Sequence, residues 1–256
     1  MISSSQNPKI KLARALTGRP KERREANAFL AEGVRLVEEA LAANWPFRFV
    51  LVSDELSERG KKLVEKLEDK KIDIEKVESR LLQSLSETET SQGIIAVLSD
   101  SRIPIPASPN FILILDSIRD PGNLGTLLRT ADTAGVQAVL IPPETTDAFA
   151  PKVVRAGMGA HFRLPIHSMS WDEIDNQTKS LQIFIADMDG QSCWETDFKS
   201  SLALIVGGEA EGASEQARKL ANAFVKIPMA GKTESLNAAV AGSVLMFEVM
   251  RQRNKV

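Results

Sequence analysis

Cysteine is almost absent from this sequence of 256 residues, and so is net charge. The single cysteine, Cys193, excludes an intramolecular disulfide framework and a cysteine metal cluster, and it suits a reducing compartment. The 34 acidic and 32 basic residues nearly balance, so the whole molecule is not a nonspecific polyanion binder. No apolar run approaches the ~20 residues of a membrane span, and the first residues lack the apolar core of a signal peptide. These absences predict a soluble, cytoplasmic protein.

Positive charge is nevertheless concentrated near the N-terminus. Residues 9–24 contain seven lysines and arginines and one acid, Glu22. Such a segment can follow a phosphate backbone, because each neutralised phosphate releases a counterion. It can equally be the solvated face of a helix, and the sequence leaves both interpretations open.

A proline-rich segment divides the chain. Residues 100–110, DSRIPIPASPN, contain three prolines and follow neither helical nor strand periodicity, which indicates a linker. Residues 1–99 are predicted to form a small α/β domain. Its predicted strands are 28–33, 47–54 and 93–100, and its predicted helices lie near 34–43, 57–69 and 79–87.

The remaining part, residues 111–256, contains almost continuous apolar runs, which are typical of strands buried on both faces of a parallel sheet. These runs are 111–116, 138–142, 181–187, 202–208 and 224–228. Helical patterns lie near 124–134, 150–158, 171–179, 214–222 and 235–252. This alternation predicts a doubly wound α/β domain with its site at the carboxyl ends of the strands.

The first of three glycine-containing loops at predicted strand ends is DPGNLGTLLRTADTAG, residues 120–135. Asn123 is the predicted N-cap of a helix whose leucines repeat at helical spacing, and Arg129 follows. The bare backbone at Gly125 leaves room for the guanidinium to turn toward the start of the helix. A surface ion pair with Asp132 is the alternative role for this arginine.

Two further loops follow later strands. IVGGEAEGAS, residues 205–214, places two glycines and Glu209 at a strand end, where bare backbone lets a ligand approach. IPMAGKTESLNAAVAG opens the segment 227–253, with a helix predicted from near Ser235 and small residues over its first turns. GKT is not a phosphate loop, because Lys226 stands where that motif requires glycine. The chain also lacks G-x-G-x-x-G, which disfavours a nicotinamide- or ATP-dependent enzyme.

Together and in this order, the three loops resemble those of the SpoU/TrmH family of RNA 2′-O-ribose methyltransferases, in the SPOUT superfamily. The matching segments are DPGNLGTLLRTADTAG, LALIVGGEAEG and IPMAGKTESLNAAVAGSVLMFEVMRQR, and the resemblance covers residues 111–253. Each segment is a weak signal alone, and the combination is highly specific. NPKIKLARAL and FLAEGVRLVEEAL look like the small substrate-binding domain, ribosomal-protein-like in fold, that many members carry.

The resemblance implies an S-adenosylmethionine-dependent enzyme whose catalytic domain contains a trefoil knot, a feature otherwise nearly absent from proteins. It also implies a homodimer, with the final helix at the interface and each active site completed by the partner. The cofactor is expected to bind mostly to main-chain groups of the knotted loops. The implied cofactor contacts are Met188, Gly207, Ile227, Met229 and Leu236, and the implied catalytic and substrate-positioning residues are Asn123, Arg129, Glu209, Ser235 and Asn237.

Methyl transfer requires a ribose 2′-oxygen in line with the methyl–sulfur bond and the loss of its proton. The family's usual candidate for this second requirement is Arg129, although an arginine ordinarily stays protonated. We favour a charged Arg129 that stabilises the developing alkoxide and holds the adjacent phosphate, over a perturbed Arg129 that acts as base. Glu209 is expected to orient Arg129, whereas helix capping is the alternative role for Asn123, Ser235 and Asn237.

RNA is the expected partner, with ribosomal RNA favoured over transfer RNA because of the attached N-terminal domain. Aromatic residues make up only 5% of the chain, so recognition by shape and phosphate is expected rather than base stacking. Lys152, Arg155 and Arg163 join the basic N-terminal segment as candidate contacts. No membrane association is expected. No metal is expected either, since His161 and His167 lack metal-ligand spacing. A non-catalytic RNA-binding or ribosome-assembly protein is the competing hypothesis.

Overall fold

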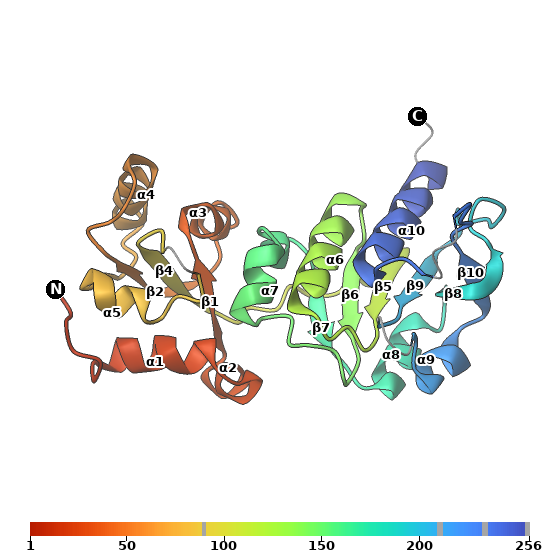
Figure 1. Cartoon of the computed structure of the whole chain (residues 1–256), viewed down its shortest axis with the longest axis horizontal. Coiled ribbons are helices and arrows are strands. Elements are labelled where there is room, and N and C mark those ends of the chain that lie inside the picture. The colour runs from red at the N-terminus through yellow and green to blue at the C-terminus, as the bar shows by residue number, and fades with distance from the viewer. Residues whose placement is uncertain (89–90, 209–211, 232–234, 254–256) are drawn as a thin grey trace. The chain divides into compact units, whose positions relative to one another are not determined.

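The chain forms two compact units, and each of them is assembled from two separate parts of the sequence (Figure 1). The computed structural model describes residues 1–88, 91–208, 212–231 and 235–253. The first unit comprises residues 1–101 and 149–162, and the second comprises 102–148 and 163–256. The segment 149–162 was expected in the second half, yet it packs in the first unit.

A four-stranded mixed sheet, in the order β1-β4-β2-β3, forms the centre of the first unit. β4 runs antiparallel to β1 and β2, whereas β3 runs parallel to β2. The strands are β1 Ala28–Glu32, β2 Phe47–Val52, β3 Ile74–Lys76 and β4 Ile94–Ser99. The helices before the linker are α1 Pro8–Thr17, α2 Pro20–Ala26, α3 Val34–Ala42, α4 Glu58–Asp69 and α5 Ser79–Gln83. The helix predicted over 79–87 therefore stops at Gln83, and α1, α2 and β3 are additions to the predicted elements.

An aromatic cluster explains why residues 149–162 pack in the first unit. This segment contains α7, Pro151–Ala156, and the 3-10 helix η1, Ala160–Phe162. Phe29 on β1 lies 5.0 Å from Phe149 and 6.4 Å from Phe162 between ring centroids, and Trp45 lies 5.4 Å from Phe162. All four rings are buried. The segment therefore supplies part of the apolar core of the first unit.

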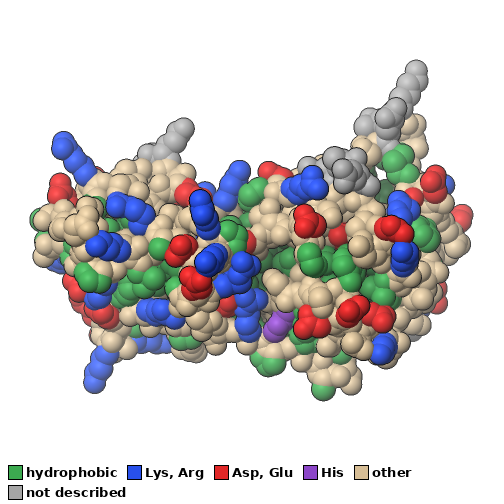
Figure 2. All heavy atoms as spheres, turned by 90° about the horizontal axis from the view of Figure 1, so that it is seen from below, with side chains coloured by type: hydrophobic (Ala, Val, Ile, Leu, Met, Phe, Trp, Pro, Cys, Tyr) green, Lys and Arg blue, Asp and Glu red, His purple; other side chains and the backbone are tan. Residues whose placement is uncertain are grey.

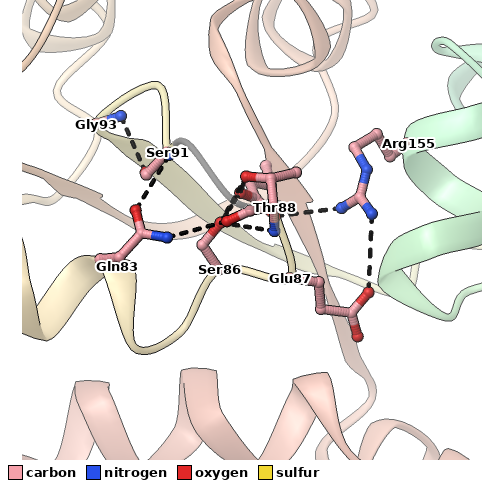
Figure 3. A network of polar contacts seen from close by, with 8 residues as sticks. Gln83, Ser86, Glu87, Thr88, Ser91, Gly93 and Arg155 are labelled. Carbon is pink, nitrogen blue, oxygen red and sulfur yellow. Dashed lines mark hydrogen bonds and ion pairs between the residues drawn. The ribbon is translucent and has the colours of Figure 1, made fainter.

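A polar network accompanies this cluster (Figure 3). The side chain of Glu32, at the end of β1, is only 8% exposed and lies 3.3 Å from the guanidinium of Arg155 on α7. Its carboxylate also accepts hydrogen bonds from the hydroxyls of Ser86 and Thr88, the latter at 2.8 Å. Arg155 lies 3.9 Å from Glu87 as well. Because a buried carboxylate is costly without partners, the network stabilises the position of α7 in this unit.

The second unit contains a six-stranded sheet in the order β10-β8-β9-β5-β6-β7, and every neighbouring pair is parallel. The predicted parallel α/β arrangement is thus confirmed. Its strands are β5 Phe111–Leu115, β6 Ala138–Ile141, β7 Ile166–Ser168, β8 Gln182–Ser192, β9 Leu202–Val206 and β10 Ala223–Lys226. Its helices are α6 Pro121–Thr133, α8 Trp171–Thr178, α9 Glu215–Leu220 and α10 Ala238–Arg253.

Small residues near the start of α10 bring this helix close to α6 and β9 (Figure 1). A Cβ at Gly242 would lie 2.5 Å from Leu127 of α6 and 3.2 Å from Val206 of β9, so glycine permits this packing. The hydroxyls of Thr130 and Ser243 are 3.1 Å apart in the same contact. In the described part of the chain, no helix is both long and apolar enough to cross a membrane.

Candidate active site

The predicted site loops leave the sheet of the second unit at one edge. β5, β8, β9 and β10 are neighbours and parallel, so their carboxyl ends face the same side of the unit. The first predicted loop follows β5, the second follows β9 and the third follows β10. In open α/β sheets this edge is where ligands bind.

Met188 lies on an irregular part of β8. The pairing with β10 passes from Ile185 opposite Phe224 to Gln191 opposite Val225, so residues 186–190 have no counterpart on the partner strand. The Met188 side chain is 55% exposed. It therefore presents an accessible thioether at the carboxyl edge of the sheet.

The glycines after β9 have a structural role in addition to the one expected. A Cβ at Gly207 would lie 2.4 Å from the backbone nitrogen of Ala213, and one at Gly208 would lie 2.4 Å from the carbonyl oxygen of Ser117. Close approach of the chain to itself, and not only approach of a ligand, therefore requires glycine at both positions. The predicted catalytic residue Glu209 lies outside the described residues.

Asn123 is not the N-cap of α6, which corrects the sequence prediction. The helix begins at Pro121, and the carboxylate of Asp120 accepts the backbone N–H of Asn123 at 2.8 Å. Proline suits the first helical position because that position needs no N–H donor, and an acidic cap suits the positive end of the helix dipole. The amide oxygen of Asn123 instead accepts a hydrogen bond from Nδ2 of Asn237 at 3.2 Å.

Asn237 has two roles in this arrangement. Its Oδ1 accepts the backbone N–H groups of Ala239 at 2.9 Å and Val240 at 3.2 Å, so it caps α10. The helix consequently starts at Ala238 rather than near Ser235, which is exposed in the preceding loop. Its amide nitrogen joins α10 to the start of α6, bringing together two predicted site residues from distant parts of the sequence.

Arg129 is exposed on α6. The alternative ion pair with Asp132 was a wrong interpretation, since Asp132 pairs with Arg163 at 2.9 Å. Among the described residues, no hydrogen bond or ion pair joins the Arg129 guanidinium to another predicted site residue. The structure thus places Asn123 and Asn237 together and leaves Arg129 on the solvent-facing side of its helix.

The third loop adds apolar groups at the same edge. Ile227 is half-buried, while Met229 and Leu236 are exposed. A Cβ at Gly231 would meet no atom within 4 Å, so its backbone is accessible. Together with Met188, these residues combine apolar surface with bare peptide groups. Cofactor sites are mostly apolar, with a few polar groups such as backbone N–H and C=O, so these residues fit S-adenosylmethionine.

Asp116 lies outside the sequence motifs that predicted the site. It directly follows β5 and is only 1% exposed, although aspartate is rarely buried. Its carboxylate accepts the backbone N–H of Ser214 at 2.6 Å. The signal was present in the sequence, as a charged residue at the carboxyl end of an uninterrupted apolar strand.

Other candidate residues have structural partners. His161 is buried in the first unit, and Nε2 of His167 lies 2.7 Å from the carbonyl oxygen of Ile103. Arg155 and Arg163, proposed as RNA contacts, form ion pairs with Glu32 and Asp132. In the ranges that the structure describes, no group of three or more His, Cys, Asp or Glu side chains could hold a metal ion.

The second unit is an open parallel α/β domain with the predicted site loops at the carboxyl edge of its sheet. Residues 110–247, more than half of the chain, match the SpoU rRNA Methylase family, and the chain belongs to this family. Residues 7–96 match the MRM3-like substrate binding domain.

Several similar proteins align with almost the whole chain. The 23S rRNA (guanosine(2553)-2′-O)-methyltransferase RlmP of Bacillus subtilis is 34% identical over 97% of this chain and 98% of its own. The 23S rRNA (uridine(2479)-2′-O)-methyltransferase of Streptomyces viridochromogenes is 30% identical over 98% and 92%. The AdoMet-bound rRNA methyltransferase from Sinorhizobium meliloti is 29% identical, with a TM-score of 0.85 over 98% of this chain and 97% of that one. The AdoMet complex of the SpoU methyltransferase AviRb from Streptomyces viridochromogenes is 28% identical, with a TM-score of 0.84 over 96% and 99%.

Proposed function

We propose that the protein transfers a methyl group from S-adenosylmethionine to a ribose 2′-hydroxyl of ribosomal RNA. The observation that carries the proposal is the hydrogen bond between Asn123 and Asn237, because it joins two of the three family loops at the edge where ligands bind. The names of the similar proteins favour ribosomal over transfer RNA as the substrate.

The cofactor would be held by the irregular part of β8 and by the loops after β9 and β10. We assign its contacts to main-chain groups at Gly207 and Ile227, and to the side chains of Met188, Met229 and Leu236. Bound there, S-adenosylmethionine supplies a methyl carbon already activated by its sulfonium. The protein's task is then to position the ribose oxygen and to stabilise the charge that develops on it.

We assign the stabilisation of this negative charge to Arg129, whose guanidinium would act as a cation beside the ribose and its phosphate. Asn123 and Asn237 orient the sugar, with Ser235 and Glu209 as further members of the site. Arg129→Lys should lose most turnover and leave S-adenosylmethionine affinity nearly unchanged, because lysine cannot reproduce the forked donor geometry. Arg163→Lys, which alters an arginine paired with Asp132, is the matched control and should retain activity. Wild-type turnover in Arg129→Lys would remove Arg129 from the mechanism.

Two experiments test the function itself. Ribose methylation mapped across total RNA, from cells with and without the gene, should show one or a few ribosomal positions that depend on this protein. Calorimetry of the purified protein with S-adenosylmethionine should show binding. An unchanged methylation map together with no cofactor binding would favour the competing hypothesis of a non-catalytic RNA-binding protein.

We propose that the first unit binds the RNA through the exposed side of α1 and α2. Two members of the basic N-terminal segment have structural roles instead: Lys9 pairs with Asp73 at 2.6 Å, and the buried Arg23 donates to backbone carbonyls. Figure 2 shows lysine and arginine side chains over the first unit, on the face where α1 and α2 lie. The exposed cations of these two helices and their connection are Lys11, Arg14, Arg19, Lys21 and Arg24.

Salt dependence of RNA binding tests this assignment. Replacing Lys11 and Arg24 by glutamine should weaken binding and lower the slope of log affinity against log salt by about 2, since each phosphate contact contributes about 1. The control replaces Arg59 and Lys61 on α4, which form ion pairs with Glu38 and Glu58. Equal slopes for both double variants would refute an α1–α2 interface.

The trefoil knot is also part of the proposal. β10 lies at the edge of the sheet beside β8, whereas α10, the next element in the chain, packs on α6 and β9. This return from the edge strand to the middle of the sheet supports a threaded chain. Pulled from its ends in optical tweezers, a knotted chain should reach a shorter contour length than 256 extended residues, and full extension would refute the knot.

A homodimer completes the proposal. Val240 and Phe247 are exposed apolar residues seven positions apart on α10, and hence on one side of this helix. Sedimentation should give the mass of two chains, and Phe247→Glu should shift it toward one. A monomeric wild-type protein would refute the dimer.

A cytoplasmic location, which fractionation would test, agrees with the ribosomal substrate and the unpaired Cys193.

A further inference from the structure

We infer that Asp116 is a positioning residue for S-adenosylmethionine binding, because Asp116 and Ser117 hold both ends of the loop after β9. The inference rests on the proposed function. It concerns Gly207 and Gly208 on one side of this loop, and Ala213 and Ser214 on the other.

The carboxylate of Asp116 holds the far end of the loop. Its Oδ2 accepts the backbone N–H of Ser214 at 2.6 Å, and its Oδ1 accepts the Ser117 hydroxyl at 3.1 Å. Ser214 is the N-cap of α9, so the same bond fixes the start of that helix. A hydrogen bond to an ionised carboxylate is about twice as strong as one between neutral groups. Burial removes the water that would compete for this carboxylate.

The backbone of the same dipeptide holds the near end. The backbone N–H of Asp116 donates to the carbonyl oxygen of Val206 at 3.0 Å, directly before Gly207. Ser117 has a φ of 57°, in the left-handed region that favours glycine. In this conformation its carbonyl oxygen lies 2.4 Å from where a Cβ of Gly208 would be. The near end is therefore packed against residues 116–117.

The two ends also contact each other. Gly208 and Gly212 form an antiparallel bridge, and the Cβ direction of Gly207 is filled by the backbone of Ala213. The loop ends and Asp116 therefore form one tightly packed unit, with the carboxylate as its charged member. Because Gly207 is a proposed cofactor contact, loss of this carboxylate should displace the peptide groups that bind the cofactor.

The test compares Asp116→Asn and Asp116→Ala with the wild-type protein, using calorimetry with S-adenosylmethionine and steady-state methylation of RNA. Asparagine keeps the shape but leaves one acceptor oxygen where two are used. Cofactor affinity should fall about 10-fold or more in Asp116→Asn, the scale of one lost charge-assisted hydrogen bond, and further in Asp116→Ala. The KM for RNA should remain near the wild-type value.

A matched control separates positioning from general destabilisation of the strand end. The hydroxyl of Thr145 donates to the carbonyl oxygen of Leu115 at 2.7 Å, one residue before Asp116. Thr145→Val should leave cofactor affinity unchanged. Wild-type affinity in a folded Asp116→Asn protein, or an equal loss of affinity in Thr145→Val, would overturn the inference. Absence of cofactor binding by the wild-type protein would instead refute the proposed function.

Discussion

Phe162→Ala would test whether residues 149–162 form part of the core of the first unit. Phe162 is 4% exposed and contacts the rings of Phe29 and Trp45, which come from the other part of that unit. Loss of a buried phenylalanine side chain costs about 3–5 kcal/mol, from the transferred surface and the cavity left behind. With a urea m-value of about 2 kcal/mol per molar, the unfolding midpoint should fall by about 2 M.

Trp45 provides an assay for the first unit alone. The chain has three tryptophans, so replacing Trp171 and Trp194 by phenylalanine leaves Trp45 as the reporter. In this background, Phe162→Ala should shift the fluorescence transition in urea. The control is Leu164→Ala, two residues further along, which is 3% exposed but belongs to the second unit. An unchanged Trp45 transition in Phe162→Ala, or an equal shift in Leu164→Ala, would show that residues 149–162 are not part of the core of the first unit.

Three further predictions concern α10 and its surroundings. Asn237→Ala should lower the free energy of unfolding by about 1 kcal/mol through the lost cap, whereas Asn237→Asp should not. Both variants should lower turnover by losing the donor to Asn123, and normal turnover would contradict this role. The hydrogen bond from Arg251 lowers the pKa of Glu248 below its ordinary value of 4.5. The stabilisation that the ionised Glu248 gives the folded protein is therefore full above that pH, and it is lost as the pH falls through the folded-state pKa. When the pH is lowered below 4.5, the melting temperature should therefore fall less for Glu248→Gln than for the wild-type protein. Burial raises the pKa of the Cys193 thiol, so a thiol reagent should label it only after unfolding, and rapid native labelling would refute its burial.

Much of the architecture was predictable, because its determinants lie close together in the sequence. The runs FILIL and LALIV predicted strands covered on both faces, and both lie inside the parallel sheet. The order of the glycine loops identified the family, since each loop follows a strand and carries its own pattern of residues. The same local patterns misplaced the cap of α6, because Asp120 and Asn123 are both suitable cap residues and the choice depends on where the helix begins.

The parallel sheet, the loops at its carboxyl edge and the family follow from periodicity and short motifs, so residue order alone was enough to predict them. Three features became visible only in the folded chain: residues 149–162 complete the first unit, Asn237 contacts Asn123, and Asp116 accepts a hydrogen bond from the loop after β9. Burial and hydrogen bonding between residues far apart in the chain select such contacts. A pattern of neighbouring residues contains no information about which distant side chain will be within reach.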